Sequence, residues 1–188
     1  MSTLKVVITS TRPGRIGGSI GRWFAAAARA HGGFDAVELL DLADLDLPIF
    51  DEPHHPRLGQ YENAHTLAWS EAIHGADAVV FVHPEYNHFP PPSLVNAIDY
   101  LHAEWTGKPV AWVSYGGASG GGFARELIGK LADFVSMRSA DSSFGITFPM
   151  KTIADGVFTP EQETIDSARA VVGELVQLAA RHDAEVAA

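Results

Sequence analysis

The stretch LKVVITSTRPGRIGGSI, residues 4–20, joins a short apolar run to the start of a helical pattern. Residues 4–8 are rich in β-branched side chains and predict a buried strand. Beyond the loop, apolar residues recur at helical spacing, at Ile20, Trp23, Phe24 and Ala27. Gly32 and Gly33 then end the helix. The stretch therefore predicts a strand, a loop rich in Ser, Thr, Pro and Gly, and a helix, in that order.

The rest of the chain repeats this alternation of strands and helices. Further strands are predicted at residues 37–42, 78–83, 110–115 and 144–148, and helices at 63–74, after FPPPS, at 123–134 and at 160–181. Three of the strands are continuously apolar, which is typical of strands buried on both faces. We therefore expect an α/β fold, a doubly wound sheet of five parallel strands with helices on both faces, formed by residues 1–188 as a single domain.

Composition and charge exclude several classes of function. The 188 residues carry a net charge of −10, which argues against nucleic acid or an anionic membrane as a partner. There is no cysteine, so disulfides, thiolate nucleophiles and cysteine-bound zinc are excluded. The sequence shows neither a run of 18 apolar residues nor a secretory leader at its start, and we expect a cytoplasmic protein.

Positive charge is concentrated near the start of the sequence. No Asp or Glu precedes Asp35, whereas Lys5, Arg12, Arg15, Arg22 and Arg29 all do. We interpret Arg22 and Arg29 as ordinary helix-surface residues, whereas Arg12 and Arg15 stand in the first loop.

Ligands of doubly wound sheets bind beyond the carboxyl ends of the strands, where the winding reverses. The loops expected there are residues 9–18, 84–92 and 114–122. In the first loop, unpaired backbone amides at the start of a helix favour an anion. Arg12 and Arg15 would add forked donors for phosphate oxygens, and Ser10 and Thr11 would add hydroxyl donors.

Three other phosphate motifs fit this loop less well. A Walker A loop needs a lysine, which is lacking here. The glycines lack the spacing of a dinucleotide fingerprint, although Asp41 lies where a ribose-binding acid is expected. A receiver domain would have acidic residues at the ends of the first and third strands. The remaining alternative is a loop around one terminal phosphate, as in the FMN site of flavodoxin-like folds.

The second loop carries a resemblance to a known family. The run HPEYNHFPPPSLVNAIDYL, residues 83–101, resembles the NAD(P)H-dependent FMN reductases, which include quinone, chromate and azo-compound reductases. STRPGRIG, residues 10–17, resembles the phosphate loop of that family, and KPVAWVSYGGASGG, residues 108–121, resembles its loop after the fourth strand. The resemblance extends over about residues 4–148, with the motifs in the expected order.

The resemblance implies FMN as cofactor, NADPH or NADH as electron donor, and a homodimer or homotetramer. The acceptor would be a small molecule: a quinone, an azo dye, a metal oxyanion or free flavin. Flavin binding is assigned to Ser10, Arg12, Arg15, Ile16, Gly17, Pro84, Glu85, Tyr86, Asn87, His88, Ser114, Tyr115, Gly116 and Gly117. Because hydride transfer is the chemistry of the cofactor, we expect no catalytic acid or base. His54 and His55 lie near Asp51 and Glu52, but such a loop is typically solvated, and we expect no metal site.

The residue types of the second and third loops agree with flavin binding. Pro84 would break strand pairing and free the following amides to face a ligand. Tyr86 offers a flat face, and Asn87 tolerates an unusual backbone conformation. Gly116 and Gly117 would let the backbone approach the ring closely.

Two departures from the family change the wall of the expected pocket or the neighbouring subunit contact. His88-Phe89 stands where many members have a small residue after the asparagine, and Val95 stands where many have lysine. They bear on substrate preference rather than on flavin binding.

Two classes of function follow. The first is an enzyme whose nicotinamide donor and acceptor use one open flavin face in turn, a ping-pong mechanism. The second is a flavin-binding electron carrier or redox-sensing protein with little turnover, which would carry an acidic docking rim. The expected flavin loops contain Arg12, Arg15 and only one acidic residue, Glu85, and this favours the enzyme.

Overall fold

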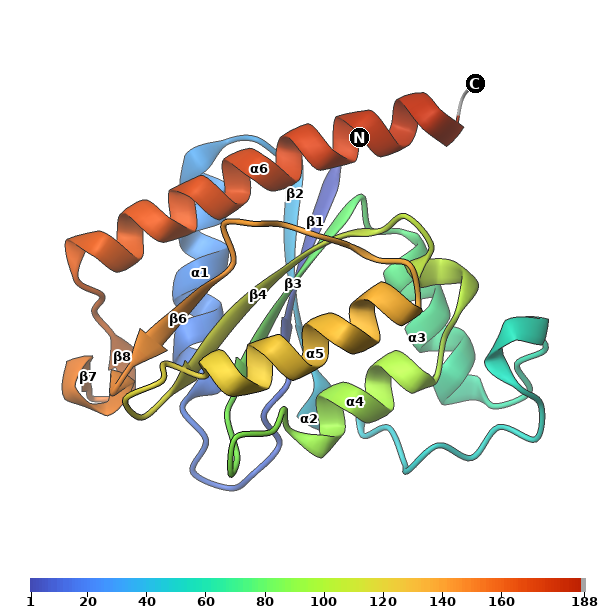
Figure 1. The fold of residues 1–188 in the computed structure, drawn as a ribbon, viewed down its shortest axis with the longest axis horizontal. Coiled ribbons are helices and arrows are strands. Elements are labelled where there is room, and N and C mark those ends of the chain that lie inside the picture. Colours follow the sequence, from blue (N-terminus) through green and yellow to red (C-terminus); the bar gives the residue numbers. More distant parts are fainter. Residues whose placement is uncertain (187–188) are drawn as a thin grey trace.

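The computed structural model describes residues 1–186. Its central sheet contains the parallel strands β1 (Thr3–Ile8), β2 (Ala36–Asp41), β3 (Ala78–Pro84) and β4 (Pro109–Gly116), in the order β2-β1-β3-β4 (Figure 1). The fifth position is divided between β5 (Arg138–Ser139) and β6 (Phe144–Thr147), which pair parallel to the two ends of β4. The prediction of a doubly wound, five-stranded parallel sheet is confirmed, with the fifth strand interrupted.

Helices cover both faces of the sheet (Figure 1). One face packs against α1 (Gly17–His31) and α6 (Gln162–Val186). The other packs against α3 (Ala64–His74), α4 (Pro92–Asp99) and α5 (Gly122–Phe134). The short elements are α2 (Leu42–Leu45), the 3-10 turns η1 (Pro56–Leu58), η2 (Ala103–Trp105) and η3 (Pro149–Thr152), and an antiparallel hairpin of β7 (Ile153–Ala154) and β8 (Val157–Phe158).

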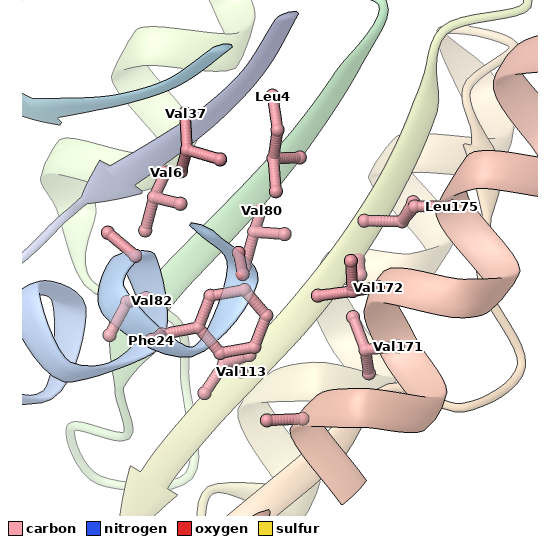
Figure 2. Close-up of a cluster of buried hydrophobic side chains, with 14 of the residues drawn as sticks. Leu4, Val6, Phe24, Val37, Val80, Val82, Val113, Val171, Val172 and Leu175 are labelled. Atoms are coloured by element: carbon pink, nitrogen blue, oxygen red, sulfur yellow. The ribbon is translucent and has the colours of Figure 1, made fainter. Parts of the chain in front are cut away.

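The central strands are buried on both faces, as their continuous apolar sequences predict. Every residue of β3 is buried, and its side chains alternate between the two hydrophobic clusters. Figure 2 shows Phe24 of α1 and Val171, Val172 and Leu175 of α6 against valines of the sheet. This packing holds α1 against the sheet, and therefore fixes the place where the first loop enters the helix.

No helix in residues 1–186 is both long and apolar enough to cross a lipid bilayer.

Candidate functional site

Three loops converge beyond the carboxyl ends of β1, β3 and β4. A cavity of about 220 Å³ lies between them. Its walls are formed by Arg12, Gly14, Arg15, Ile16, Pro84, Glu85, Tyr86, Tyr115, Gly116 and Met150. The topology rule that places ligands at this edge thus leads to residues that all three loops contribute.

Ser10, Gly17 and Tyr115 meet beneath the first loop. A Cβ atom added to Gly17 would lie 2.3 Å from the Oγ of Ser10 and 2.6 Å from the hydroxyl oxygen of Tyr115. Ser10 is fully buried, and its Oγ lies toward the hydroxyl of Tyr115 without a hydrogen bond of ordinary geometry among the described residues. A buried hydroxyl that is not fully satisfied favours a ligand that supplies a further partner.

Tyr115 is a neutral hydroxyl at physiological pH. Burial raises the pKa of its side chain to about 12. The tyrosine therefore keeps its proton and can donate a hydrogen bond at the base of the first loop.

The start of α1 offers hydrogen-bond donors of the kind that bind anions. Ile16 at the N-cap makes no side-chain capping bond within the described chain, and the first turn contains no acidic residue. The amides of this turn point toward the first loop with the positive end of the helix dipole. A phosphate group fits these donors, and the buried hydroxyl of Ser10 lies beside Gly17 in this turn.

The two arginines of the loop have different surroundings. Arg12 is exposed, and no carboxylate in residues 1–186 forms an ion pair with it. Arg15 is turned toward β2, where its Nη2 lies 2.6 Å from Oδ2 of Asp41. The Nε of Arg15 is buried and has no partner within the described residues. Arg12 is thus the arginine that is free to bind a phosphate.

The second loop is a tight hairpin. Tyr86 and Phe89 exchange backbone hydrogen bonds of 2.9 and 3.0 Å around Asn87 and His88, whose φ angles are 52° and 69°. Such a two-residue turn with both φ angles positive is a type I′ arrangement, in which asparagine is favoured. The unusual backbone predicted at Asn87 is confirmed.

The expectation that Pro84 frees the following amides is wrong. The amide of Glu85 donates to the carbonyl of Tyr115 at 3.0 Å, and that of Tyr86 donates to Phe89. Pro84 ends β3 in register with β4, and Glu85 continues the pairing for one more bond. The next amide, that of Tyr86, is hydrogen-bonded within the hairpin.

Glu85 joins the second loop to the third. Its carboxylate accepts hydrogen bonds from Ser119 Oγ at 2.8 Å and from the amide of Ala124 in the first turn of α5 at 3.1 Å. Burial alone would raise the pKa of Glu85, but these two donors, together with the nearby His88 and the amide of Phe123, lower the pKa below its usual value. Glu85 is therefore an ionised, fixed brace and not a proton donor.

His88 forms a second contact between the second loop and α5, on the protein surface. Its ring stacks on Phe123 of α5, with ring centres 4.3 Å apart and planes inclined by 27°. Asn87 and His88 are exposed and do not line the cavity, although both are predicted flavin-binding residues.

In the third loop, the side chain of Ser114 lies behind the cavity wall. Its hydroxyl donates to the carbonyl of Gly120 at 2.8 Å and accepts from Arg125 Nη1 at 2.9 Å. A Cβ at Gly121, where φ is +83°, would lie 2.7 Å from the Cβ of Ser114. Ser114, Arg125 and these glycines shape the turn and do not reach the cavity.

Of the two glycines that follow Tyr115, Gly116 lines the cavity and Gly117 does not. A Cβ atom added to Gly116 would lie 3.2 Å from the amide nitrogen of Gly121. Gly117 is exposed and would have only Phe148 near an added Cβ, at 3.9 Å.

Sequence reasoning missed the contribution of Met150, which follows β6. Met150 belongs to η3 and lines the cavity, and the preceding Phe148 is half exposed, with a φ of 46°. No apolar periodicity could have revealed them, because this segment is too short to show one. Within residues 1–186, no group of three His, Asp or Glu side chains could hold a metal ion.

Comparison with known proteins identifies the family of this chain. A family model described as NADPH-dependent FMN reductase matches residues 3–151. An NAD(P)H-dependent FMN reductase of Schizosaccharomyces pombe is 41% identical over 160 residues, covering 84% of this chain and 79% of that protein. A quinone reductase of Pseudomonas putida is 35% identical over 111 residues, covering 54% of this chain and 55% of its own.

Among solved structures, the fold is similar to that of FerB, a flavoenzyme NAD(P)H:(acceptor) oxidoreductase of Paracoccus denitrificans. The TM-score is 0.76 at 22% identity, covering 97% of this chain and 99% of FerB. The relatives are reductases, which decides between the two predicted classes in favour of the enzyme. The chain belongs to the NADPH-dependent FMN reductase family, flavodoxin-like oxidoreductases that use FMN and NAD(P)H.

Proposed function

We propose that this enzyme passes electrons from NAD(P)H to a small molecule, either a quinone, an azo dye, a metal oxyanion or free flavin, and that donor and acceptor bind in turn. The convergence of the three loops on one cavity is the observation that carries the proposal. A flat ring bound against these loops would have one face covered by the protein. The donor and the acceptor would then use the other face in turn.

Different residues of the site would bind the phosphate and the ring of FMN. Arg12 and the amides of the first turn of α1 would hold the phosphate, with the hydroxyl of Ser10 as a further donor. Tyr86, Tyr115 and Gly116 would form the wall along the ring. FMN itself supplies the chemistry of accepting and releasing hydride. The stoichiometry we propose is one FMN per chain, held by a single domain.

The braces around the cavity keep its shape while substrates exchange. Glu85 is fixed by Ser119 and Ala124, and Ser114 by Gly120 and Arg125. These bonds hold the second and third loops to the start of α5. They need no change of protonation near neutral pH, because the pKa of Glu85 lies below its usual value.

Alternate binding predicts a kinetic pattern. In FMN-loaded protein, NADPH or NADH alone should bleach the flavin absorbance under anaerobic conditions, before any acceptor is added. Initial rates with a quinone varied at several donor concentrations should give parallel double-reciprocal lines. Intersecting lines would show a complex that holds both substrates, and a flavin that neither nicotinamide bleaches would contradict the proposed function itself.

We also propose that the enzyme is a homodimer or homotetramer. Phe89 and Phe123 are 62% and 50% exposed beside the site, and the ring of Phe123 stacks on His88, the neighbour of Phe89. Exposed apolar side chains that gather at one place mark protein interfaces. Sedimentation at micromolar concentration should show a dimer or tetramer, and a fully active monomer would exclude a shared site.

A further inference from the structure

A second cavity lies beside the first, between the start of α1 and the β7–β8 hairpin. It measures about 300 Å³, and Arg22, Asp41 and Gly156 contribute to its walls. The two cavities share Arg15 and its neighbours Gly14 and Ile16. One elongated ligand could therefore extend from the flavin site into this second cavity.

Arg22 gives the second cavity a positive charge that no carboxylate among the described residues neutralises. The residue belongs to α1, and its Nη1 lies 3.2 Å from the position that a Cβ on Gly18 would occupy. The guanidinium thus lies over the first turn of its own helix, toward the positive end of the dipole. No carboxylate in the described part of the chain forms an ion pair with Arg22. A cation in this position is stabilised only if an anion joins it.

Asp41, the acidic residue of the cavity, is already engaged. Its Oδ2 accepts from Arg15 Nη2 at 2.6 Å, and its Oδ1 accepts from the amide of Ala43 at 3.0 Å. In dinucleotide sites, a free carboxylate accepts a hydrogen bond from the ribose 2′-hydroxyl of NADH, whereas an arginine binds the 2′-phosphate of NADPH. In this cavity the guanidinium of Arg22 is available to a ligand, whereas the carboxylate of Asp41 is already hydrogen-bonded.

We propose that this second cavity binds the 2′-phosphate of NADPH, and that Arg22 determines a preference for NADPH over NADH. The inference rests on the proposed function, because it requires that the nicotinamide of the donor reach the first cavity. A phosphate monoester carries a charge of about −1.5 to −2 at neutral pH. The guanidinium fork matches two of its oxygens. The lining of the second cavity contains Arg15 and Arg22 against the single acidic residue Asp41, and this leaves one positive charge for the phosphate.

The test is a binding measurement that needs no turnover. Calorimetry on FMN-loaded protein would compare NADP⁺ with NAD⁺ for the native protein, Arg22→Gln and Arg22→Lys. NADP⁺ should bind the native protein roughly tenfold to a hundredfold more tightly than NAD⁺, the range for hydrogen bonds to a charged group. Arg22→Gln should remove most of that ratio by weakening NADP⁺ alone, and Arg22→Lys should retain part of it.

Arg29→Gln is the matched control, because it removes the same charge from the same helix, at a residue whose Nη2 donates to the carbonyl of Val37. It should leave the ratio unchanged. An unchanged ratio in Arg22→Gln, or no preference in the native protein, would overturn the inference. If the affinity for FMN fell in Arg22→Gln by the same factor, the arginine would serve the flavin phosphate instead. Failure of the native protein to bind FMN would contradict the proposed function, whereas these outcomes concern Arg22 alone.

Discussion

Replacing Gly17 with alanine is expected to reduce FMN affinity on the order of a hundredfold and to destabilise the fold by about 1–3 kcal/mol. The added Cβ would lie 2.3 Å from Ser10 Oγ and 2.6 Å from the Tyr115 hydroxyl, closer than real Cβ contacts. Ser10 is fully buried and Tyr115 is 5% exposed, so neither side chain has space into which to withdraw. Either the hydroxyls turn away or the first turn of α1 shifts. Both changes displace donors that would hold the phosphate.

Gly122→Ala is the matched control for this substitution. Gly122 is the first residue of α5, as Gly17 is of α1, but an added Cβ there has nothing within 4 Å. Alanine should therefore leave FMN affinity unchanged and leave stability equal or slightly higher. Flavin fluorescence titration and thermal denaturation of the apoprotein would measure both effects. Native FMN affinity in Gly17→Ala would show that the close contact of Gly17, Ser10 and Tyr115 has no part in binding.

The central part of the fold could be predicted because the sequence of each buried strand is a mainly apolar run. The fifth strand was harder, since it is interrupted between β5 and β6. At the interruption, the amide of Trp112 in β4 donates to the side chain of Ser143 at 3.0 Å, in place of a strand carbonyl. A side chain that substitutes for a backbone partner leaves no mark on the hydrophobic pattern. β5 itself has two residues, Arg138 and Ser139, and neither is apolar.

The β7–β8 hairpin did leave a recognisable pattern. Asp155 and Gly156 form its turn, with φ angles of 50° and 74°, and Asp-Gly is a typical pair for a two-residue hairpin loop. The strands on either side have two residues each, which is too few for alternation to be noticed. This hairpin matters, because it forms one wall of the second cavity.

The loops of the site could be located from topology, but the direction of individual side chains could not. Ser114 stands in the correct strand end, yet its hydroxyl is taken up by Gly120 and Arg125. Arg15 stands in the correct loop, yet it pairs with Asp41, which is 26 residues away in the sequence. Both outcomes depend on how separate segments pack together. Spacing along the chain does not determine that packing.

This difference between the two loop arginines leads to the second large effect. Arg12→Ala should weaken FMN binding by about 1.5–3 kcal/mol, the contribution of a hydrogen bond to a charged group, or roughly tenfold to a hundredfold. Thermal stability of the apoprotein should not change, because Arg12 is exposed and forms no ion pair with a carboxylate in residues 1–186. Higher salt should weaken FMN binding to the native protein more than to the variant, since screening reduces an attraction that the variant lacks.

Arg15→Ala is the contrasting variant, since Arg15 and Asp41 form an ion pair with side chains that are only 27% and 16% exposed. Its removal should lower the melting temperature of the apoprotein, because the carboxylate of Asp41 is left without its cation in a partly buried place. Asp41→Asn in the Arg15→Ala background should recover part of that loss, since it removes the unpaired charge. FMN titration of Arg12→Ala, Arg15→Ala and the double variant then shows which arginine binds the phosphate and which stabilises the loop. Unchanged FMN affinity in Arg12→Ala would remove Arg12 from the site, and the phosphate would then depend on the amides of α1 and on Ser10.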